Sequence, residues 1–343
     1  VEAVQAAGGV VPLEDADLAS EMGEADAGGQ SGHAGADDDC VVVGVFHAAV
    51  SDALAVVTIH HIATDEWSAA PLRADLDLAY RARRAGAAPD WSPLPFQYAD
   101  FAAWQRVRVS GPHRERLVDF WRATLDGAPE ELSLPYDRPR PARPSGRGDG
   151  VFVGLDTALV TALRDLAENT GASMFMIVQA AVAVVLGRLG GGDDIPIGTP
   201  VTVRGDARLD GLVGFFLTTV VVRTDLSGEP TTRDLLARVR ATDLAALDHR
   251  DIPFEQVVEA VTSSRSTAMN PLFQTMVVYV EGTLPDPSVA APAAPTTAKF
   301  DLSFDFTEDP GTGDPAGARI GGVIEYSTDL FDRETVEAMA SRL

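Results

Sequence analysis

The chain has 343 residues and carries 27 Lys and Arg against 51 Asp and Glu, a formal net charge of −24 at pH 7. A surface this acidic argues against binding to nucleic acid or to anionic membranes, because phosphate groups need a basic surface. The single cysteine, Cys40, excludes an internal disulfide and is typical of a reducing compartment, so we expect a cytoplasmic protein.

The first predicted elements lead to a pair of histidines. Residues 11–18 predict the start of a helix with an acidic cap, and residues 23–39, rich in Gly, Ala and Asp, predict a loop. Two runs of β-forming residues follow, at 40–48 and 53–61. They predict an antiparallel strand pair whose second strand ends in the histidines.

His60 and His61 are the first candidates for chemistry, with Asp65 four residues after the second. Imidazole can take or give a proton near neutral pH. Neighbouring residues of a strand point to opposite faces, so only one of the two rings would face a given pocket. The alternative is a purely structural histidine pair at the end of a strand, whose ring nitrogens form hydrogen bonds with the backbone. A metal site built from His61 and Asp65 lacks a third ligand at a suitable spacing, and we expect none.

The middle of the chain predicts two helices and a linker. Residues 68–84 have apolar residues at helical spacing and basic residues at their end. Residues 97–105 place aromatic side chains on one helical face, which predicts core packing. Residues 134–150 are rich in Pro, Gly and Arg, and proline breaks both helix and strand. This linker separates two predicted lobes, residues 1–145 and 146–343, and its arginines are either solvated or in contact with an anionic carrier group.

The second lobe alternates predicted strands and helices. Residues 174–189 are apolar almost all round, which predicts a buried central helix, and the apolar run is too short to cross a bilayer. We therefore expect no membrane segment. The other predicted helices are 158–168, 232–247, 253–261 and 331–343. The predicted strands are 151–153, 195–203, 212–223, 273–280, 299–306 and 322–327.

Several sequence motifs connect these elements to a known family. The segment from His60 to Glu66 resembles the HHxxxDG signature of condensation domains in nonribosomal peptide synthetases. Further stretches resemble other motifs of the same family in the same order: YxDFAxW at 98–104, LPxDRPRP at 134–141, VGxFVNT at 213–219, HQDxPFE at 249–255 and NPLFQ at 270–274. The resemblance covers most of the chain, and coincidence does not explain it.

The resemblance implies an α/β fold with mixed sheets, in which two chloramphenicol acetyltransferase-like lobes form a V around a central tunnel. It implies an acyltransferase that joins two acyl groups, each carried as a thioester on the 4'-phosphopantetheine arm of a carrier protein. The acceptor amine would attack the donor carbonyl to form an amide. The expected partners are upstream and downstream peptidyl carrier proteins and an adjacent adenylation domain. No cofactor bound by the domain itself is expected.

The resemblance also implies roles for individual residues. His61 is the expected catalytic residue, with His60 and Asp65 supporting it. Arg204 would pair with Asp65, and the alternative is an exposed arginine in a turn. Trp67, in the sequence Asp-x-Trp-Ser, fits the subtype that joins an L-configured donor to an L-configured acceptor.

Three positions modify what the resemblance implies. Glu66 stands where glycine is usual and adds a carboxylate beside the histidines. Thr218 stands where asparagine is usual, which alters any polar contact made there. Gly214 allows backbone or substrate to approach closely. The chain also begins inside the expected first lobe, so we expect the N-terminal part of that lobe to be missing.

Two other functions are compatible with the same motifs. One is an epimerisation domain or a catalytically inert relative that docks carrier proteins, since inert relatives tolerate an acidic residue at the position of Glu66. The other is a free-standing acyltransferase of the same fold that uses a soluble amine or alcohol. An assay with loaded carrier proteins separates all of these from amide formation.

Overall fold

The structure of the protein is a computed structural model that describes residues 11–13, 40–48, 53–262, 266–282, 284, 294–310 and 318–343. Contacts between residues divide the chain into two compact units. The first unit comprises Val1–Ala103 and Arg204–Phe216. The second comprises Trp104–Val203 and Leu217–Leu343.

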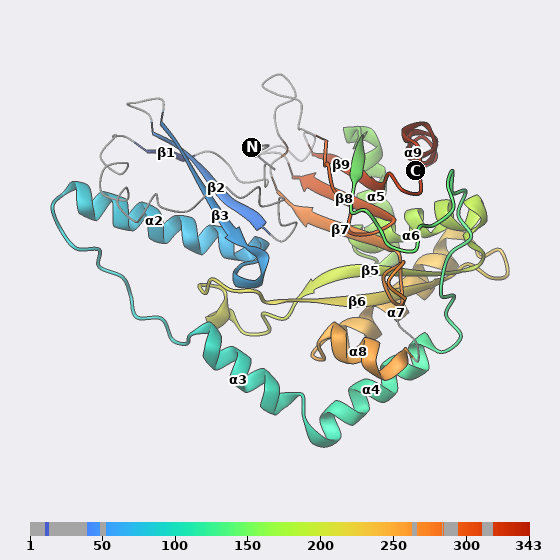
Figure 1. Ribbon diagram of the computed structural model, residues 1–343, viewed down its shortest axis with the longest axis horizontal. Coiled ribbons are helices and arrows are strands. Elements are labelled where there is room, and N and C mark those ends of the chain that lie inside the picture. Colours follow the sequence, from blue (N-terminus) through green and yellow to red (C-terminus); the bar gives the residue numbers. More distant parts are fainter. Residues whose placement is uncertain are drawn as a thin grey trace. The chain divides into compact units, whose positions relative to one another are not determined.

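The first unit contains a three-stranded sheet in the order β1-β2-β3 (Figure 1). Its strands are β1 (Val11–Leu13), β2 (Cys40–Ala48) and β3 (Ala53–His60). β2 and β3 form the predicted antiparallel pair, with Cys40 opposite His60. β1 pairs with β2 in parallel, so the helix predicted over 11–18 is wrong for residues 11–13. Residues 14–18 of that helix and the loop predicted over 23–39 lie outside the described residues. Pairing with a strand that is distant in sequence outweighs a weak local helix signal.

Two short 3₁₀ turns connect β3 to the first long helix. They are η1 (His61–Ala63) and η2 (Glu66–Ser68), and α2 (Ala69–Arg84) follows directly. The last turn of α2 is basic, as predicted, and cations interact favourably with the C-terminal end of a helix. α3 (Tyr98–Arg108) begins in the first unit, and a third short turn, η4 (Ala207–Leu209), also belongs to this unit.

The second unit is built on a six-stranded sheet in the order β4-β9-β8-β7-β5-β6 (Figure 1). Its strands are β4 (Gly148–Leu155), β5 (Asp194–Thr202), β6 (Leu217–Asp225), β7 (Thr275–Glu281), β8 (Leu302–Asp309) and β9 (Arg319–Ser327). β7 runs parallel to both β5 and β8, and the other pairs of the sheet are antiparallel. The predicted α/β class with mixed sheets is confirmed.

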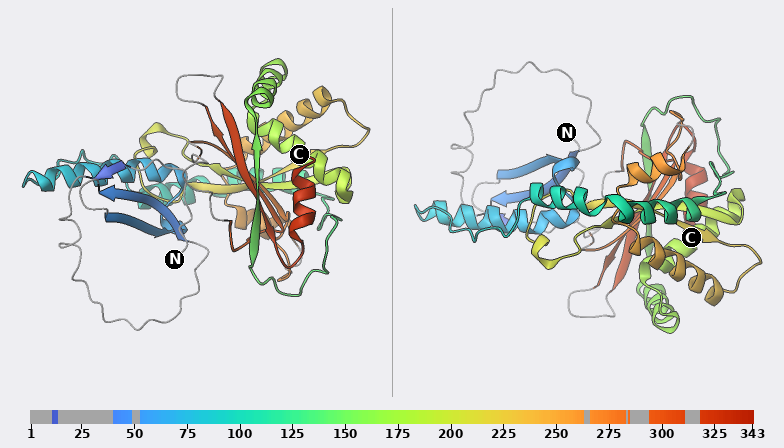
Figure 2. Two further views of the ribbon diagram at one scale, coloured as in Figure 1. Left: turned by 90° about the horizontal axis from the view of Figure 1, so that it is seen from above. Right: turned by 90° about the horizontal axis from the view of Figure 1, so that it is seen from below.

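Helices pack against this sheet and against one another. They are α4 (Gly111–Leu125), α5 (Thr157–Thr170), α6 (Met174–Leu186), α7 (Thr232–Asp248), α8 (Phe254–Val261) and α9 (Arg333–Ala340). α6 packs on α5 and α7, α4 packs on α8, and α9 packs on β4 (Figure 2). Consecutive residues of β6, Val220, Val221 and Val222, are all buried. Since neighbouring strand residues point to opposite faces, both faces of the sheet are covered there.

α6 is the central helix of the second unit. It is buried along most of its length, from Met176 to Leu186, as its apolar sequence predicts. Together with the π turn that follows, residues 174–191, it is long and apolar enough to cross a membrane by length and composition. Half of that stretch is buried inside the unit, which is typical of a core helix.

Several predicted boundaries differ from those of the structure, and two of the differences have a structural cause. The helix predicted to reach residue 189 ends at Leu186, and a π turn follows in which Gly190 has a φ of 110°, a conformation that favours glycine. The strand predicted over 212–223 begins only at Leu217, because the backbone before it bonds to side chains of the first unit. The predicted division into lobes 1–145 and 146–343 stays a prediction.

Candidate functional site

β3 ends between two histidines, and each ring contacts the turn that follows. His60 is exposed, and its Nδ1 accepts a hydrogen bond from the Ile62 backbone N–H at 3.1 Å. His61 begins η1, and its Nδ1 lies 2.8 Å from the Thr64 carbonyl oxygen. A carbonyl oxygen only accepts, so the hydrogen bond assigns the proton of a neutral His61 ring to Nδ1 and leaves Nε2 with its lone pair.

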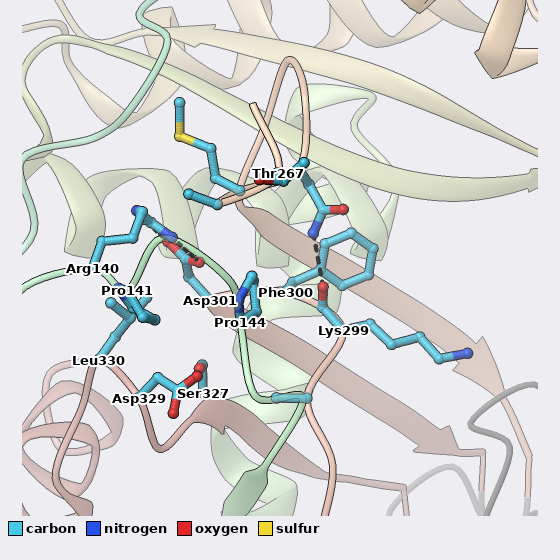
Figure 3. A pocket seen from close by; sticks show the side chains of 14 residues that line it. Arg140, Pro141, Pro144, Thr267, Lys299, Phe300, Asp301, Ser327, Asp329 and Leu330 are labelled. Atoms are coloured by element: carbon cyan, nitrogen blue, oxygen red, sulfur yellow. Dashed lines mark hydrogen bonds and ion pairs between the residues drawn. The ribbon is translucent and has the colours of Figure 1, made fainter. Parts of the chain in front are cut away.

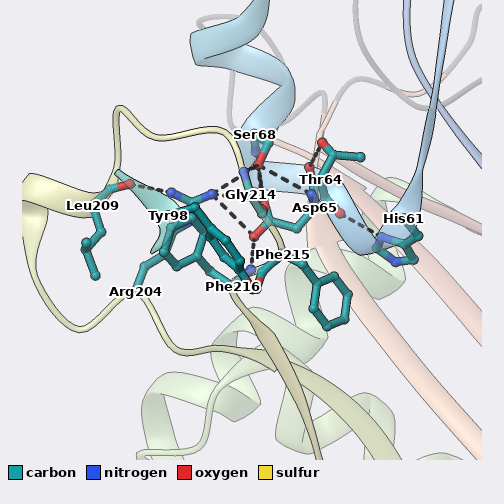
Figure 4. Close-up of polar contacts among 10 residues, drawn as sticks. All are labelled: His61, Thr64, Asp65, Ser68, Tyr98, Arg204, Leu209, Gly214, Phe215 and Phe216. Carbon is teal, nitrogen blue, oxygen red and sulfur yellow. Dashed lines mark hydrogen bonds and ion pairs between the residues drawn. The ribbon is translucent and has the colours of Figure 1, made fainter. Parts of the chain in front are cut away.

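The Phe215 ring lies beside the His61 ring (Figure 4). The two ring centroids are 5.1 Å apart and the ring planes meet at 89°, which is an edge-to-face contact. The ring is half-buried, and Thr64 fixes it from the Nδ1 side. This is the arrangement that a general base or an amine-positioning residue needs, because the accepting nitrogen keeps one orientation.

The Asp65 carboxylate is buried, and both of its oxygens accept hydrogen bonds within the first unit (Figure 4). It caps η2, since Oδ1 accepts from the Ser68 N–H at 2.8 Å and from the Ser68 hydroxyl at 2.6 Å. Oδ2 accepts from the Phe216 N–H at 2.9 Å. Nη2 of Arg204 lies 3.1 Å from Oδ1 and 3.3 Å from Oδ2. The carboxylate therefore ties η2 to the segment 204–216.

Arg204 completes this network from the other side. The side chains of Arg204 and Asp65 are 3% and 0% exposed. Nη1 of Arg204 donates to the Leu209 carbonyl, and Nη2 also lies 3.1 Å from the Ser68 hydroxyl. The guanidinium carbon lies 4.0 Å from the centre of the Phe216 ring, a cation–π contact. The ion pair that the resemblance implies is present, and the alternative of an exposed turn arginine is wrong.

Gly214 lies where two segments of the first unit approach closely. Its N–H donates to the Ser68 hydroxyl oxygen at 3.1 Å, and its carbonyl oxygen lies 2.9 Å from the same atom. A Cβ on Gly214 would lie 2.3 Å from Cδ2 of the Tyr98 ring. Tyr98 donates its hydroxyl to the Phe215 carbonyl at 2.8 Å, and burial, helped by the charge of Asp65, raises the pKa of Tyr98. The close approach expected at Gly214 is therefore made by an aromatic ring.

The remaining predicted site residues take no part in this network. Glu66 and Trp67 begin η2 with exposed side chains. Although Glu66 is exposed, the protein atoms around its carboxylate partly desolvate it and raise its pKa; Asp65 raises it further, and His61 acts to lower it. Thr218 belongs to the second unit, on β6, and its hydroxyl is buried with no hydrogen-bond partner among the residues that the structure describes.

Ser68 and Phe216 are site residues that sequence reasoning missed. The Ser68 hydroxyl contacts Asp65, Arg204 and Gly214, so it lies at the centre of the network. The spacing Asp-x-x-Ser is typical of a helix cap in which both residues bond to each other's backbone, and that signal predicts a role for Ser68. Phe216 bonds to Asp65 across 151 residues, and no local pattern predicts such a contact.

The part of the chain that the structure describes supports neither a metal site nor a catalytic role for His249. Among the described residues, no group of three or more His, Cys, Asp or Glu is placed to hold a metal ion. Asp65 is occupied by Arg204 and by backbone N–H groups, so a metal at His61 would lack its carboxylate ligand. His249 stacks on Phe120 with 3.6 Å between ring centroids, and its Nδ1 lies 2.7 Å from a backbone carbonyl of α7, which supports the predicted structural role.

The second unit has a separate pocket beside the Pro- and Arg-rich stretch (Figure 3). The cavity has a volume of about 150 Å³, and none of the predicted site residues lines it. Arg140 borders it, is only 14% exposed, and pairs with Asp301 and Glu131. The prediction of a solvated arginine is therefore wrong for Arg140, since carboxylates replace its water. Arg138 pairs with Asp332 at the surface.

Comparison with known proteins places the chain in a family. Residues 24–343 match the family described as Condensation domain. The dimodular nonribosomal peptide synthase of Bacillus subtilis is 42% identical over 302 residues, which cover 84% of this chain and 12% of that protein. Malpinin synthetase of Mortierella alpina is 41% identical over 309 residues, which cover 88% of this chain and 4% of that protein. The chain thus spans only a small part of the length of these relatives.

Solved structures agree with this placement. The X-domain in complex with OxyB from teicoplanin biosynthesis has a TM-score of 0.76 and 33% identity, covering 97% of this chain and 74% of that chain. The SgcC5 protein from Streptomyces globisporus has a TM-score of 0.68 and 25% identity, covering 87% of this chain and 70% of that chain. The motifs, the family match and the relatives agree, and the chain belongs to the condensation domain family.

Proposed function

We propose that the chain forms an amide bond between a donor acyl or peptidyl thioester and the amine of an acceptor aminoacyl thioester, each held by a carrier protein. The His61 ring is the observation that carries the proposal. Thr64 fixes its Nδ1, Phe215 packs edge to face with it, and Nε2 keeps its lone pair. The buried pair of Asp65 and Arg204 braces the turn that follows. Membership of the condensation domain family supports an acyltransferase.

The reaction requires that two thioesters are held close to each other and that one proton is transferred. The acceptor amine attacks the donor carbonyl, a C–N bond forms, and the carbonyl oxygen becomes an oxyanion. The tetrahedral intermediate then collapses, the C–S bond breaks, and the proton lost by the amine ends on the departing thiolate. Holding the reactants together can supply about 7–11 kcal/mol of the barrier reduction. The protein therefore has to add orientation and a proton acceptor.

The geometry of His61 favours a proton acceptor over a donor to the oxyanion. With Nδ1–H directed to the Thr64 carbonyl, a neutral ring has no proton on Nε2 to donate. General base catalysis by a positioned side chain contributes roughly 10²–10⁴-fold. In this proposal His60 supports the turn by capping it, as its bond to the Ile62 N–H indicates.

The finer assignments belong to the same proposal. The sequence Asp65-x-Trp67-Ser68 supports an L-configured donor and an L-configured acceptor. The synthetase relatives support upstream and downstream peptidyl carrier proteins, their phosphopantetheine arms and an adjacent adenylation domain as partners. A cytoplasmic location is proposed from the cysteine content alone.

A second candidate function is docking without catalysis. It is favoured by the likeness to the X-domain, which was solved as a complex with OxyB, and by the acidic Glu66 beside the histidines. The complete pair of His60 and His61 favours catalysis instead. An epimerisation domain and an acyltransferase that uses a soluble amine are the remaining alternatives.

A two-carrier assay separates these functions. The chain is mixed with a donor-loaded and an acceptor-loaded carrier protein, and mass spectrometry follows the acceptor carrier. Amide formation adds the donor acyl mass to the acceptor carrier, and an unchanged mass with intact donor thioester contradicts the proposal. Epimerisation changes the configuration of the loaded residue without a mass change. A soluble-amine acyltransferase forms product without the acceptor carrier.

A further inference from the structure

The cavity of the second unit is lined by two motif stretches that have no role in the His61 site. Arg140 comes from the stretch 134–141, and Asn270 comes from the stretch 270–274, far away in the sequence (Figure 3). No residue of the network around His61 lines this cavity. The fold of the second unit therefore brings two separate motifs together around a space for which the proposed reaction has no use.

Hydrogen bonds hold the walls of the cavity in place. The Asp329 carboxylate accepts from the Ser145 backbone N–H at 2.6 Å and from the Ser145 hydroxyl at 2.8 Å. Nη1 of Arg140 donates to Oδ1 of Asp301 at 2.8 Å. All of these residues except Ser145 line the cavity, so its shape is fixed before a ligand arrives.

The interior of the cavity combines apolar surface with a free hydroxyl group. Its lining includes the apolar residues Ala268, Ala298, Phe300 and Leu330. Ser327 also lines it and is only 9% exposed, and its hydroxyl has no hydrogen bond among the residues that the structure describes. The volume is about 150 Å³, and a cavity of this size can hold a group as large as a benzene ring.

The rim of the cavity is basic, in contrast to the chain as a whole. Residues 138–147 contain four arginines and no acidic residue, whereas the net charge of the chain is −24. Arg143, which stands between two prolines that line the cavity, is exposed and has no ion pair among the described residues. Arg147 is 78% exposed, with Nε 3.3 Å from the Ser145 hydroxyl and Nη2 3.9 Å from Oδ1 of Asp329. Neither guanidinium has a carboxylate of the described chain at hydrogen-bond distance.

We propose that this cavity and its rim bind an acidic polypeptide segment of a partner protein or domain. One apolar side chain of the segment enters the cavity, and carboxylates on either side of it pair with Arg143 and Arg147. Charge complementarity selects this occupant, because the rim is the basic part of an acidic chain. Arg140 is already paired with Asp301 and Glu131, so the interior offers no unpaired arginine to a small anion.

A weak contact of this kind is sufficient when the partner belongs to the same polypeptide. In two relatives the matched region is only 12% and 4% of the protein. A segment joined to the same chain has a high effective concentration, so that modest affinity gives substantial occupancy. The inference does not depend on amide formation, since it concerns a surface that contains no residue of the His61 network.

Three short peptides test the two parts of the proposal with the full chain. The first has a Phe between two pairs of Glu, the second has Ala in place of the Phe, and the third has Gln in place of every Glu. Each carries a fluorescent label, and fluorescence anisotropy gives its Kd. We expect the first peptide to bind about 3- to 10-fold more tightly than either of the others, because two exposed ion pairs and one partly buried ring each contribute modestly.

Two kinds of variant assign these preferences to the cavity and to its rim. The double variant Arg143→Gln/Arg147→Gln should lose the preference for Glu over Gln and keep the preference for Phe over Ala. Ala268→Phe fills the cavity and should do the reverse. Ala298→Leu fills it from another segment, so the test remains decisive if Ala268→Phe does not fold.

The double variant Arg106→Gln/Arg116→Gln is the matched control, because it removes two exposed arginines from α3 and α4 of the same unit. It should change no Kd. Equal binding of the Glu and Gln peptides, an equal loss in the control, or a preference for Phe that survives a filled cavity would overturn the inference. Displacement of the first peptide by inorganic phosphate at constant ionic strength would show a site for small anions and would overturn it as well.

Discussion

Arg204 and Asp65 form a buried ion pair across 139 residues of sequence, with Nη2 of the arginine 3.1 Å from Oδ1 of the aspartate. The same carboxylate accepts the backbone N–H groups of Ser68 and Phe216. Burying two charges is favourable only when hydrogen bonds compensate for the lost water, and here both carboxylate oxygens accept hydrogen bonds. The pair therefore fixes η2, the turn directly after His61, to the segment 204–216.

Replacing Arg204 should strongly destabilise the first unit. Arg204→Met leaves the Asp65 carboxylate buried without its cation, which typically costs about 3–5 kcal/mol. Urea denaturation followed by far-UV circular dichroism measures the change in the free energy of unfolding. Arg208→Met is the control, because Arg208 pairs with Asp206 at the surface, where the side chains are 63% and 42% exposed, and no measurable change is expected. Equal effects of the two variants would contradict the bracing role.

Gly214→Ala should destabilise the protein through one methyl group. The added Cβ would lie 2.3 Å from the Tyr98 ring, so the ring or the backbone has to move. Overpacking of this kind costs roughly 1–3 kcal/mol. Gly211→Ala is a matched control in the same segment, since a Cβ there meets nothing within 4 Å. Thermal unfolding of both variants checks the prediction, and a neutral Gly214→Ala would mean that the Tyr98 ring does not pack there.

Asp243 should make stability depend on pH. It is buried in α7, where the Gln179 amide, oriented to satisfy both neighbours, donates to Asp243 Oδ2 at 2.6 Å and accepts from Thr224 Oγ1 at 3.1 Å. Burial raises the pKa of Asp243 to about 7, and the Gln179 hydrogen bond acts to lower it. The unfolded value is about 3.9, so the folded chain binds a proton that the unfolded chain lacks between about pH 4 and pH 7. The free energy of unfolding therefore falls as pH rises through that window.

Asp243→Asn removes this titration. The variant should be more stable than the original chain at pH 8, by roughly 1–4 kcal/mol, and the difference should shrink toward pH 4. Urea denaturation at a series of pH values gives the two curves. Asp248→Asn, an exposed change on the same helix, should leave the slope as it is. Parallel curves for Asp243→Asn and the original chain would show that Asp243 does not titrate in this window.

The sequence correctly predicted those elements whose hydrophobic pattern lies within the element itself. The β-forming runs of β2 and β3 and the apolar sequence of α6 gave the correct elements, because alternation and all-round apolarity are properties of neighbouring residues. β1 was predicted as helix because its pairing with β2 depends on a distant segment. The strand predicted over 212–223 begins late because Asp65, far away in sequence, takes the Phe216 N–H.

The site residues also divide into those that their spacing in the sequence predicted and those that depend on contacts with distant segments. His60, His61 and Asp65 stand together in sequence, so their spacing predicted them as candidates. The partner Arg204 came from the resemblance to a family and not from any local signal. The contact of Phe215 with the His61 ring was missed, because nothing near either residue predicts that a distant segment returns to this turn.

A comparison of His61→Ala with His60→Ala tests the central claim most directly. Both variants are mixed in single turnover with a donor-loaded and an acceptor-loaded carrier protein, and the amide on the acceptor carrier is measured by mass spectrometry. The account predicts that His61→Ala loses about 10²–10⁴-fold in rate while its unfolding curve stays close to that of the original chain. His60→Ala, which removes the cap of η1, should keep most of its rate. Condensation by His61→Ala at the original rate would contradict the account.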